Sequence, residues 1–505
     1  MNPKLLKGSL LLFLLVAFTV VRGQTADDSV LIRRLADTIL TDGKAYSNLK
    51  VLTKQVGARL SGSAGYYKAE KWGVAALTDA SGAFGASNAS GAFGASNASG
   101  ASNTSGAAGA SGAAGKVYLQ ECMVPHWVRG GRDSATFVGR HGSKAEGKWV
   151  TIDGPLDILA LGNSVGTGPA GLTAPVVLIH DFDELERRKD EIKGKIVFYN
   201  YKFNPLFIET FKAYGDAVRY RAMGPSRAAK YGAVAVLVRT MGEGVDNNPH
   251  TGALMYNDSF PKIPAAAVGL RNADMLAGVL ERGGGEVTVY LRTMAHMLPD
   301  TVAHNVIGEI RGSEFPDQYI TVGGHLDSWD PAEGAQDDGA GCVQSIEVLR
   351  ALQAIGYKPR HTIRVVLFAN EENGGRGGRK YAGAAKEAGE KHILGLESDA
   401  GGFTPRAFSL GLSDAQLATI RPWLTLLQPY GVYEFIKGGG GSDVSPMGPQ
   451  LGAVVGELLP DSQRYFDLHH SRADVLENVN KRELELGTVN MAALIYLVDK
   501  YGFGQ

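Results

Sequence analysis

The sequence predicts an α/β protein whose main domain is a three-layer, mostly parallel β-sheet with helices on both faces. Three observations predict this architecture. From residue 302 onward, apolar strand-like segments alternate with segments of helical periodicity, as in sheets that are covered on both sides. The segment TIRVVLFAN (362–370) is apolar along most of its length, which is typical of a central parallel strand. A Gly- and β-rich block at 131–297 indicates a second, inserted domain between residues 24–130 and 298–505 of the main one.

The overall composition agrees with a globular protein of more than one domain. A chain of 505 residues is too long for one simple core, and 44% hydrophobic and 20% charged residues are ordinary values. The net charge of −1 gives no electrostatic reason to expect nucleic acid or an acidic membrane as a partner. The sequence is compatible with a homodimer. Cys122 and Cys342 form no disulfide framework, and for Cys342, in an apolar helix-like stretch, we expect a buried free thiol.

The N-terminus has the features of a secretory signal peptide, which we assign to residues 1–23. Lys4 and Lys7 precede an apolar run from Leu10 to Val21. Because this run is short for a transmembrane helix, we expect a secreted or periplasmic protein without a stable membrane anchor; a retained anchor is the alternative.

The N-terminal part of the main domain, 24–130, contains three kinds of segment. Residues 28–78 are predicted to be helical, with a Gly-rich turn at 58–65. Residues 79–115 are of low complexity, with GAFGASNAS occurring twice, and are expected to form a flexible insert. Residues 116–128 are predicted to be a strand that runs into an irregular turn at Pro125.

The inserted block and the C-terminal part alternate strands with helices. In the block we expect strands at 175–180, 195–200, 233–238 and 286–293, with helices near 217–231 and 271–282. In the C-terminal part we expect strands at 319–324, 393–399 and 452–459, with helices at 340–355 and near 376–388, 413–430 and 481–500. Functional sites of such sheets lie beyond the carboxyl ends of the strands.

Metal-binding side chains recur at these predicted strand ends. His325 and Asp327 follow the first strand in GGHLDSWD, and Asp337 and Asp338 follow in AQDDGAG, where one carboxylate could instead cap a helix. Each of these segments alone also fits an ordinary loop.

Further acids and histidines follow the next strands. Glu371 and Glu372 follow the most apolar strand, Asp399 follows the next, and His469 and His470 lie in DLHHSRAD. Two adjacent glutamates at a buried strand end would repel unless a cation or a shared proton relieves them. The set as a whole is typical of zinc-assisted hydrolysis, in which one glutamate binds metal while its neighbour takes a proton from water.

A serine hydrolase is the weaker interpretation. GNSVG at 162–166 matches the G-x-S-x-G pattern, but TGPAGLTAP follows it and cannot form the helix that such a nucleophile needs.

The ordered motifs GGHLDSWD, DDGAG, NEENGG, ESDAGG and HHSRAD resemble those of the co-catalytic zinc exopeptidases of the bacterial leucyl aminopeptidase type, and within them the carboxypeptidase Q group. ARLSGSAG (58–65), PHWVRG (125–130) and HNVIGEIRG (304–312) also resemble that group. The resemblance covers about 28–78 and 116–500; the 79–115 repeat is foreign to it.

The resemblance implies two zinc ions as cofactors, short peptides as substrates and a role for each site residue. His325 and Asp399 would belong to one ligand set, Glu372 and His470 to the other, and Asp337 would bridge both ions. Glu371 would be the general base and Asp327 the partner of His325, while a cis bond would join Asp337 to Asp338. The inserted block would be a protease-associated-like domain.

Three alternatives stay open at this point. The same metal core serves aminopeptidases and carboxypeptidases, and an amidohydrolase would use the same metals. A non-catalytic peptide-binding protein is the third alternative. No residue of the sequence identifies the group that holds the substrate terminus or stabilises the oxyanion.

Overall fold

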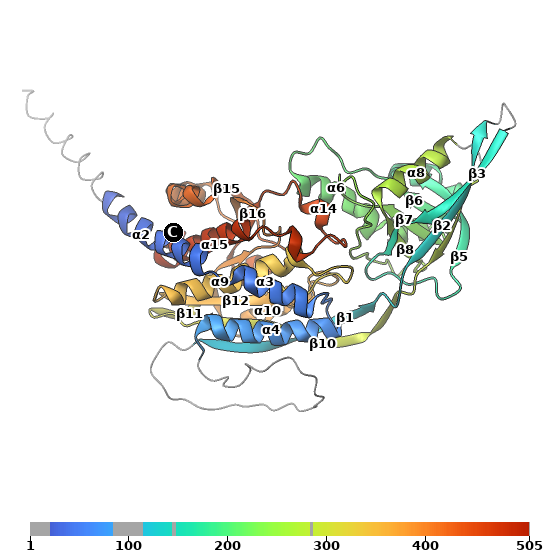
Figure 1. Ribbon diagram of the computed structural model, residues 1–505. Coiled ribbons are helices and arrows are strands. Elements are labelled where there is room, and N and C mark those ends of the chain that lie inside the picture. Colours follow the sequence, from blue (N-terminus) through green and yellow to red (C-terminus); the bar gives the residue numbers. More distant parts are fainter. Residues whose placement is uncertain (1–20, 84–114, 144–147, 283–285, 504–505) are drawn as a thin grey trace, which may run out of the picture.

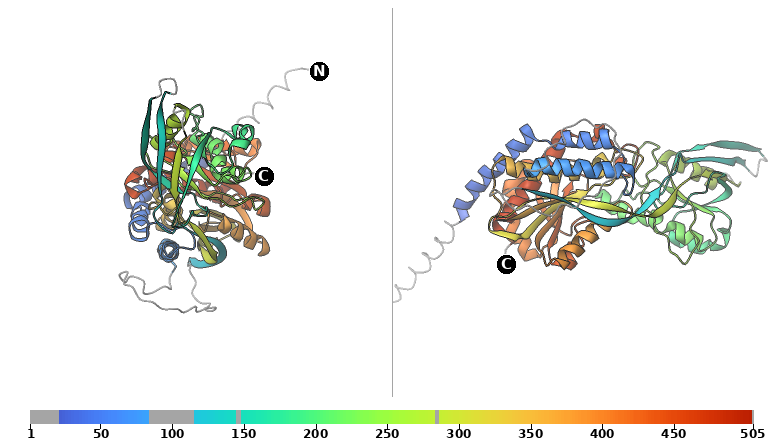
Figure 2. Two further views of the ribbon diagram at one scale, coloured as in Figure 1. Left: turned by 90° about the vertical axis from the view of Figure 1, so that its right-hand side faces the viewer. Right: turned by 90° about the horizontal axis from the view of Figure 1, so that it is seen from below.

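The computed structural model describes residues 21–83, 115–143, 148–282 and 286–503 of the chain. Residues 1–20 of the predicted signal peptide and 84–114 of the predicted low-complexity insert lie outside these ranges. The described chain folds into two parts that lie side by side and are joined by two long strands (Figures 1 and 2).

The larger part is built on an eight-stranded mixed sheet (Figure 1). In spatial order its strands are β1 (Lys116–Val128), β10 (His296–Ile310), β12 (His361–Phe368), β11 (Phe315–His325), β13 (Lys391–Glu397), β16 (Val454–Pro460), β14 (Pro405–Leu410) and β15 (Glu434–Lys437). The central strands β12, β11, β13 and β16 run parallel. The pairs β1–β10, β10–β12 and β14–β16 are antiparallel, and the edge strand β15 is parallel to β14. The prediction of a mostly parallel sheet therefore describes the centre, and the sheet as a whole is mixed.

Helices cover both faces of this sheet, as predicted. One face packs against α2 (Val21–Asp42), α3 (Ala45–Val51), α4 (Ala64–Ser81), α9 (Ala340–Ala354) and α15 (Lys481–Tyr501). The other face packs against α10 (Arg376–Glu387) and α13 (Met447–Leu451). Strand β12 is buried along its whole length between these layers, which explains why its sequence is apolar at successive positions.

Two predicted elements differ from the structure at a proline. The predicted helix 413–430 is divided into α11 (Asp414–Ile420) and α12 (Leu424–Leu427) by 3-10 turns at Arg421–Trp423 and Gln428–Tyr430, each with a proline in its first turn. Strand β1 does not end in a turn at Pro125 but continues past it, with a register shift between Val124 and His126.

The smaller part, the inserted domain, carries the second eight-stranded sheet. Its order is β3 (Lys148–Leu156), β2 (Ser134–Ser143), β9 (Thr288–Arg292), β5 (Leu172–Ile179), β6 (Ile196–Tyr199), β7 (Ala235–Arg239), β8 (Ala265–Val268) and β4 (Ile158–Ala160). Helices α5 (Phe182–Arg187), α6 (Thr210–Ala222), α7 (Gly224–Ala229) and α8 (Leu270–Arg282) accompany it. Its parallel strands β5 to β8 have separate apolar clusters on their two faces.

The chain enters the inserted domain through β1 and leaves it through β10, which pair antiparallel from Lys116 with Glu309 to Val128 with His296 (Figure 1). This ribbon places the inserted domain beside the carboxyl ends of the central strands (Figure 2). Among the described residues, the helices are too short or too polar to cross a lipid bilayer.

Candidate active site

The candidate site residues come from loops that follow neighbouring parallel strands. His325 is the last residue of β11, Glu371 and Glu372 follow β12, and Asp399 follows β13. Parallel strands end at the same sheet edge, so these segments converge there. The structure brings together all seven residues that the sequence singled out, which are His325, Asp327, Asp337, Glu371, Glu372, Asp399 and His470.

Asp337 lies between two histidines and uses a different oxygen toward each. Its Oδ1 is 3.1 Å from Nε2 of His325, which is also 3.2 Å from Oδ1 of Asp399. Its Oδ2 is 3.2 Å from Nε2 of His470, which is also 3.1 Å from Oε2 of Glu372. The five side chains thus form two acid–histidine sets that share one carboxylate. A cis peptide bond joins Asp337 to Asp338, as the resemblance implies.

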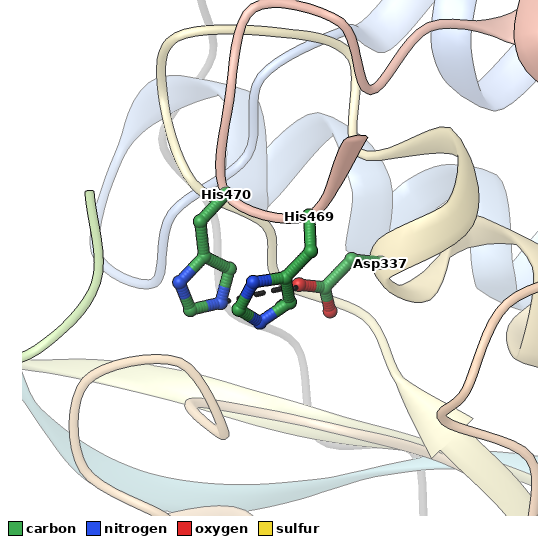
Figure 3. Close-up of side chains that lie close together, drawn as sticks. All are labelled: Asp337, His469 and His470. Atoms are coloured by element: carbon green, nitrogen blue, oxygen red, sulfur yellow. Dashed lines mark ion pairs between the residues drawn. The ribbon is translucent and has the colours of Figure 1, made fainter. Parts of the chain in front are cut away.

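His469 is also close to this centre. Its ring stacks on that of His470, with centroids 3.5 Å apart, and its Nε2 is 3.7 Å from Oδ2 of Asp337. Figure 3 shows both imidazoles, which come from one loop, beside the Asp337 carboxylate. The longer distance of His469 and its packing against Tyr214 and Phe466 favour His470 as the nearer donor.

Burial and mutual repulsion shift the pKa values of this cluster. Burial, together with the Asp337 charge, raises the pKa of the Glu372 carboxyl to about 8. Burial raises the pKa of Asp399 to about 6, against the opposing effect of His325. Burial alone would lower the pKa of His470, but Glu372 and Asp337 raise it to about 10. Carboxylates crowded in this way are stabilised by a cation.

The donor set fits divalent zinc. Imidazole nitrogens and carboxylate oxygens are zinc ligands, and three groups of such side chains lie close enough to hold an ion: His325–Asp337–Glu372, Asp337–His469–His470 and His325–Asp338–Asp399. Oδ2 of Asp337 is buried and accepts no hydrogen bond of good geometry, although His470 is near. A buried carboxylate oxygen without a donor is stabilised when a cation binds it. The residues present therefore fit a metal centre.

Asp327 contacts the site in a different way from the one that the resemblance implies. Nδ1 of His325 lies 3.0 Å from the backbone oxygen of Asp327 and 3.7 Å from its carboxylate, so the hydrogen-bond partner is the carbonyl. The Asp327 carboxylate instead accepts a hydrogen bond from the backbone N–H of Glu371 at 3.0 Å. It therefore fixes the start of the loop that carries both glutamates.

Several residues that sequence reasoning missed hold the ligand loops. The carboxylate of Asp474 accepts hydrogen bonds from the backbone N–H groups of Ala335, Gln336 and Asp337. Arg59, fully buried, donates to the backbone oxygens of Leu326, Glu333 and Gly334. Arg59 lies in the ARLSGSAG motif and Asp474 ends the HHSRAD motif, but neither motif indicates which loop its residue holds.

The inserted domain also reaches this centre. Nδ1 of His470 lies 3.3 Å from the backbone oxygen of Thr251, so the ring can donate to that carbonyl while Nε2 faces Asp337. Gly162 packs so closely on Trp329 that a Cβ added there would lie 1.8 Å from the indole ring. Backbone from the inserted domain thus supports one side of the site.

Two further expectations can be compared with the structure. Cys122 and Cys342 are unpaired, as expected, and both are buried. In the GNSVG segment no helix follows Ser164, and its hydroxyl accepts a hydrogen bond from the backbone N–H of Ala265. This serine is therefore part of the backbone packing of the inserted domain.

Comparison with known proteins agrees with this geometry. Residues 305–495 match peptidase family M28. Carboxypeptidase Q of Mus musculus is 35% identical over 382 residues, which are 76% of this chain and 77% of that protein. Carboxypeptidase Q of Homo sapiens is 36% identical over 383 residues, 76% of either protein.

Solved structures share the fold. The peptidase M28 precursor from Shewanella amazonensis SB2B is 30% identical, with a TM-score of 0.81 over 94% of this chain and 97% of that chain. The zinc aminopeptidase BSAP from Bacillus subtilis is 18% identical, with a TM-score of 0.58 over 89% and 93%, a likeness of fold alone. The sequence relatives and the acid–histidine centre together lead to one conclusion: the chain belongs to peptidase family M28 and is a zinc metallopeptidase of the carboxypeptidase Q type.

Proposed function

We propose that the protein is a secreted or periplasmic dizinc exopeptidase that removes C-terminal residues from short peptides. The observation that carries the proposal is the position of Asp337, whose two oxygens each lie about as close to a different histidine, at 3.1 and 3.2 Å. One carboxylate between two separate imidazoles is the arrangement that a pair of bridged ions requires.

Each ion would be held by one of the two sets. His325 and Asp399 would hold the first, Glu372 and His470 the second, and Asp337 would bind both. Zinc bound there would lower the pKa of a coordinated water toward neutrality and polarise the substrate carbonyl.

Glu371 is the proposed general base. It is only partly buried, and its carboxyl takes part in neither acid–histidine set. It would accept the proton of the attacking water and then donate it to the leaving amine. Asp327 would hold the Glu371 backbone in place while its carbonyl orients His325.

The inserted domain is proposed to act as a protease-associated-like domain that limits access to the site. Its backbone supports His470 through Thr251 and packs Gly162 against Trp329, so it borders the metal residues directly. A wall at this position would favour short peptides over folded proteins.

The second candidate function is an aminopeptidase on the same metal core. It is favoured by two buried acids that lie together, Glu397 and Asp443, since acidic side chains attract a substrate ammonium; Glu397 accepts a hydrogen bond from the backbone N–H of Asp443 at 3.1 Å. Both oxygens of Asp443 are buried without a hydrogen-bond partner. A non-catalytic peptide-binding protein would need neither a general base at Glu371 nor the Asp337 carboxylate that two histidines share.

A matched set of dipeptides and tripeptides tests the proposal: free, N-acetylated and C-amidated forms, with and without a zinc chelator. Chelator-sensitive cleavage that survives N-acetylation but not C-amidation is expected. The reverse pattern would make the protein an aminopeptidase. Failure to cleave any peptide, with zinc shown to be bound, would favour the amidohydrolase or binding-protein alternatives.

A further inference from the structure

A cavity lies between the inserted domain and the loop that carries the two glutamates. Its volume is about 420 Å³, large enough for an amino-acid residue. Asn163 and Tyr256 of the inserted domain line one side, and Asn373 and Gly374 line the other. Asn373 directly follows Glu372, and its side chain and backbone exchange hydrogen-bond contacts with Asn163 at 3.3 Å. The cavity therefore begins one residue from a proposed zinc ligand.

Positive charge faces this cavity from both sides. Lys262 comes from the inserted domain, and Arg376 and Arg379 come from the first turn of α10. Asp258 is the one carboxylate among the described residues that line it; its side chain is 93% exposed and lies 3.7 Å from Lys262. Once Asp258 is paired with Lys262, the positive charges of Arg376 and Arg379 have no counterpart among the described residues that line the cavity.

The first turn of α10 adds to this electrostatic preference. The residue before the helix is Gly375, in a left-handed conformation at φ 60°, and it offers no side chain to cap the helix. Two N–H groups of the first turn are bonded from outside the helix: that of Arg376 to Oδ1 of Asn370 at 3.4 Å, and that of Gly377 to the carbonyl of Ala369 at 2.9 Å. The N-terminal end of a helix carries partial positive charge and free backbone N–H groups. Arg376 has only a distant acidic partner, with Asp300 at 3.9 Å, and Arg379 donates to the backbone oxygen of Gly374. Within the described part of the chain, neither guanidinium is neutralised by a close carboxylate.

The rest of the lining is largely apolar. Leu254, Met255 and Met297 contribute to it, and Met255 and Met297 are 64% and 44% exposed. Methionine adapts its shape to different apolar groups, so these side chains suit an uncharged residue of variable size.

We propose that this cavity binds the C-terminal residue of the substrate, with its α-carboxylate held by Arg376, Arg379 and Lys262. This inference rests on the proposed function and deepens it, because it names the cations that would select a free C-terminus. Binding of the α-carboxylate in this cavity would make the enzyme remove residues from the carboxyl end of the peptide. The apolar lining would favour an uncharged side chain on the released residue.

The double variant Arg376→Gln and Arg379→Gln tests this assignment. Its kcat/KM is measured on an N-acetyl dipeptide with a C-terminal leucine, as the free acid and as the amide. Loss of charge-assisted hydrogen bonds should lower the value for the free acid about tenfold to a hundredfold, mainly through KM, and leave the value for the amide unchanged. Lys380→Gln is the matched control, since Lys380 is exposed on the same helix and does not line the cavity.

Each outcome decides a different question. If the wild type prefers the free acid and the double variant keeps that preference, the cavity assignment is wrong although the peptidase function stands. If the wild type cleaves no peptide, the proposed function fails, and titration of wild type and double variant with leucine and leucinamide decides the assignment. Leucine binding that weakens in the double variant but not in Lys380→Gln supports it. Equal binding of leucine by all three proteins, or no binding by the wild type, overturns it.

Discussion

At the scale of single residues, two adjacent glutamates are placed in different surroundings. The Glu372 side chain is 2% exposed, lies 3.1 Å from His470 and accepts a hydrogen bond from the backbone N–H of Trp329 at 3.1 Å. Glu371 is partly exposed and is fixed through its backbone by Asp327. Neighbouring residues that follow a strand point in different directions, so one position can serve the metal and the next the reaction.

Glu371→Ala and Glu372→Ala should therefore fail in different ways. We expect Glu371→Ala to retain zinc and to lose about 10²–10⁴-fold in kcat, because a proton acceptor is removed. Glu372→Ala should lose zinc together with activity, because a ligand is removed. Zinc content by elemental analysis and kcat are measured on the same preparations. A parallel fall of zinc and activity in Glu371→Ala would contradict the role proposed for it.

At the scale of helices and strands, the position of the site could be predicted because several of its residues directly follow predicted strands. The apolar run of β12 and the alternation after residue 302 were enough to place His325, Glu371 and Asp399 at one sheet edge. The supports could not be predicted. Arg59 donates to backbone oxygens that begin 267 residues away in sequence, and Asp474 accepts from backbone N–H groups as far as 139 residues away. No local pattern marks such contacts. Their partners are fixed only when the chain is folded.

An ion cluster at the opposite end of the strands gives a prediction about stability. Arg364 on β12 lies 2.8 Å from Glu390 and 2.9 Å from Glu309, and His392 lies 3.0 Å from Glu390. Burial would raise the pKa of Glu390, but hydrogen bonds from His392 and Arg364 lower it to about 2. The folded state therefore binds a proton at Glu390 less readily than the unfolded state does.

Glu390→Gln should destabilise the protein by roughly 1–2 kcal/mol near neutral pH, a figure reduced for the partial exposure of the group. Because the folded pKa is depressed, the contribution of Glu390 is complete above about pH 4.5 and is lost as the pH falls toward about 2. Urea unfolding of the wild type and the variant at several pH values measures the difference. Glu387→Gln, at an exposed position on α10, is the control and should show little effect at any pH.

At the scale of the whole molecule, the metal residues and the inserted domain depend on each other. Nε2 of His470 faces Asp337, while its Nδ1 faces the Thr251 carbonyl in the other part of the chain. Gly252, next to Thr251, has a φ of 128° and leaves no room for a side chain beside the His470 ring. The sequence predicts an inserted block and a separate catalytic part, and no local pattern indicates that the two parts contact each other at the metal residues.

The antiparallel pairing of Val128 with His296 has a practical consequence, since the chain departs from the main sheet and returns to it at neighbouring positions. A tight turn between these two residues would bypass the whole inserted domain and turn the ribbon into an ordinary hairpin. Such a shortened protein would keep His325, Asp337 and Glu372 but would lack Thr251. We expect its zinc affinity to fall about tenfold to a hundredfold, because the imidazole at 470 would lose the acceptor that orients it. Zinc retention after dialysis against a graded chelator, alongside a circular dichroism spectrum, would measure this effect; unchanged retention would mean that the main domain builds its metal centre unaided.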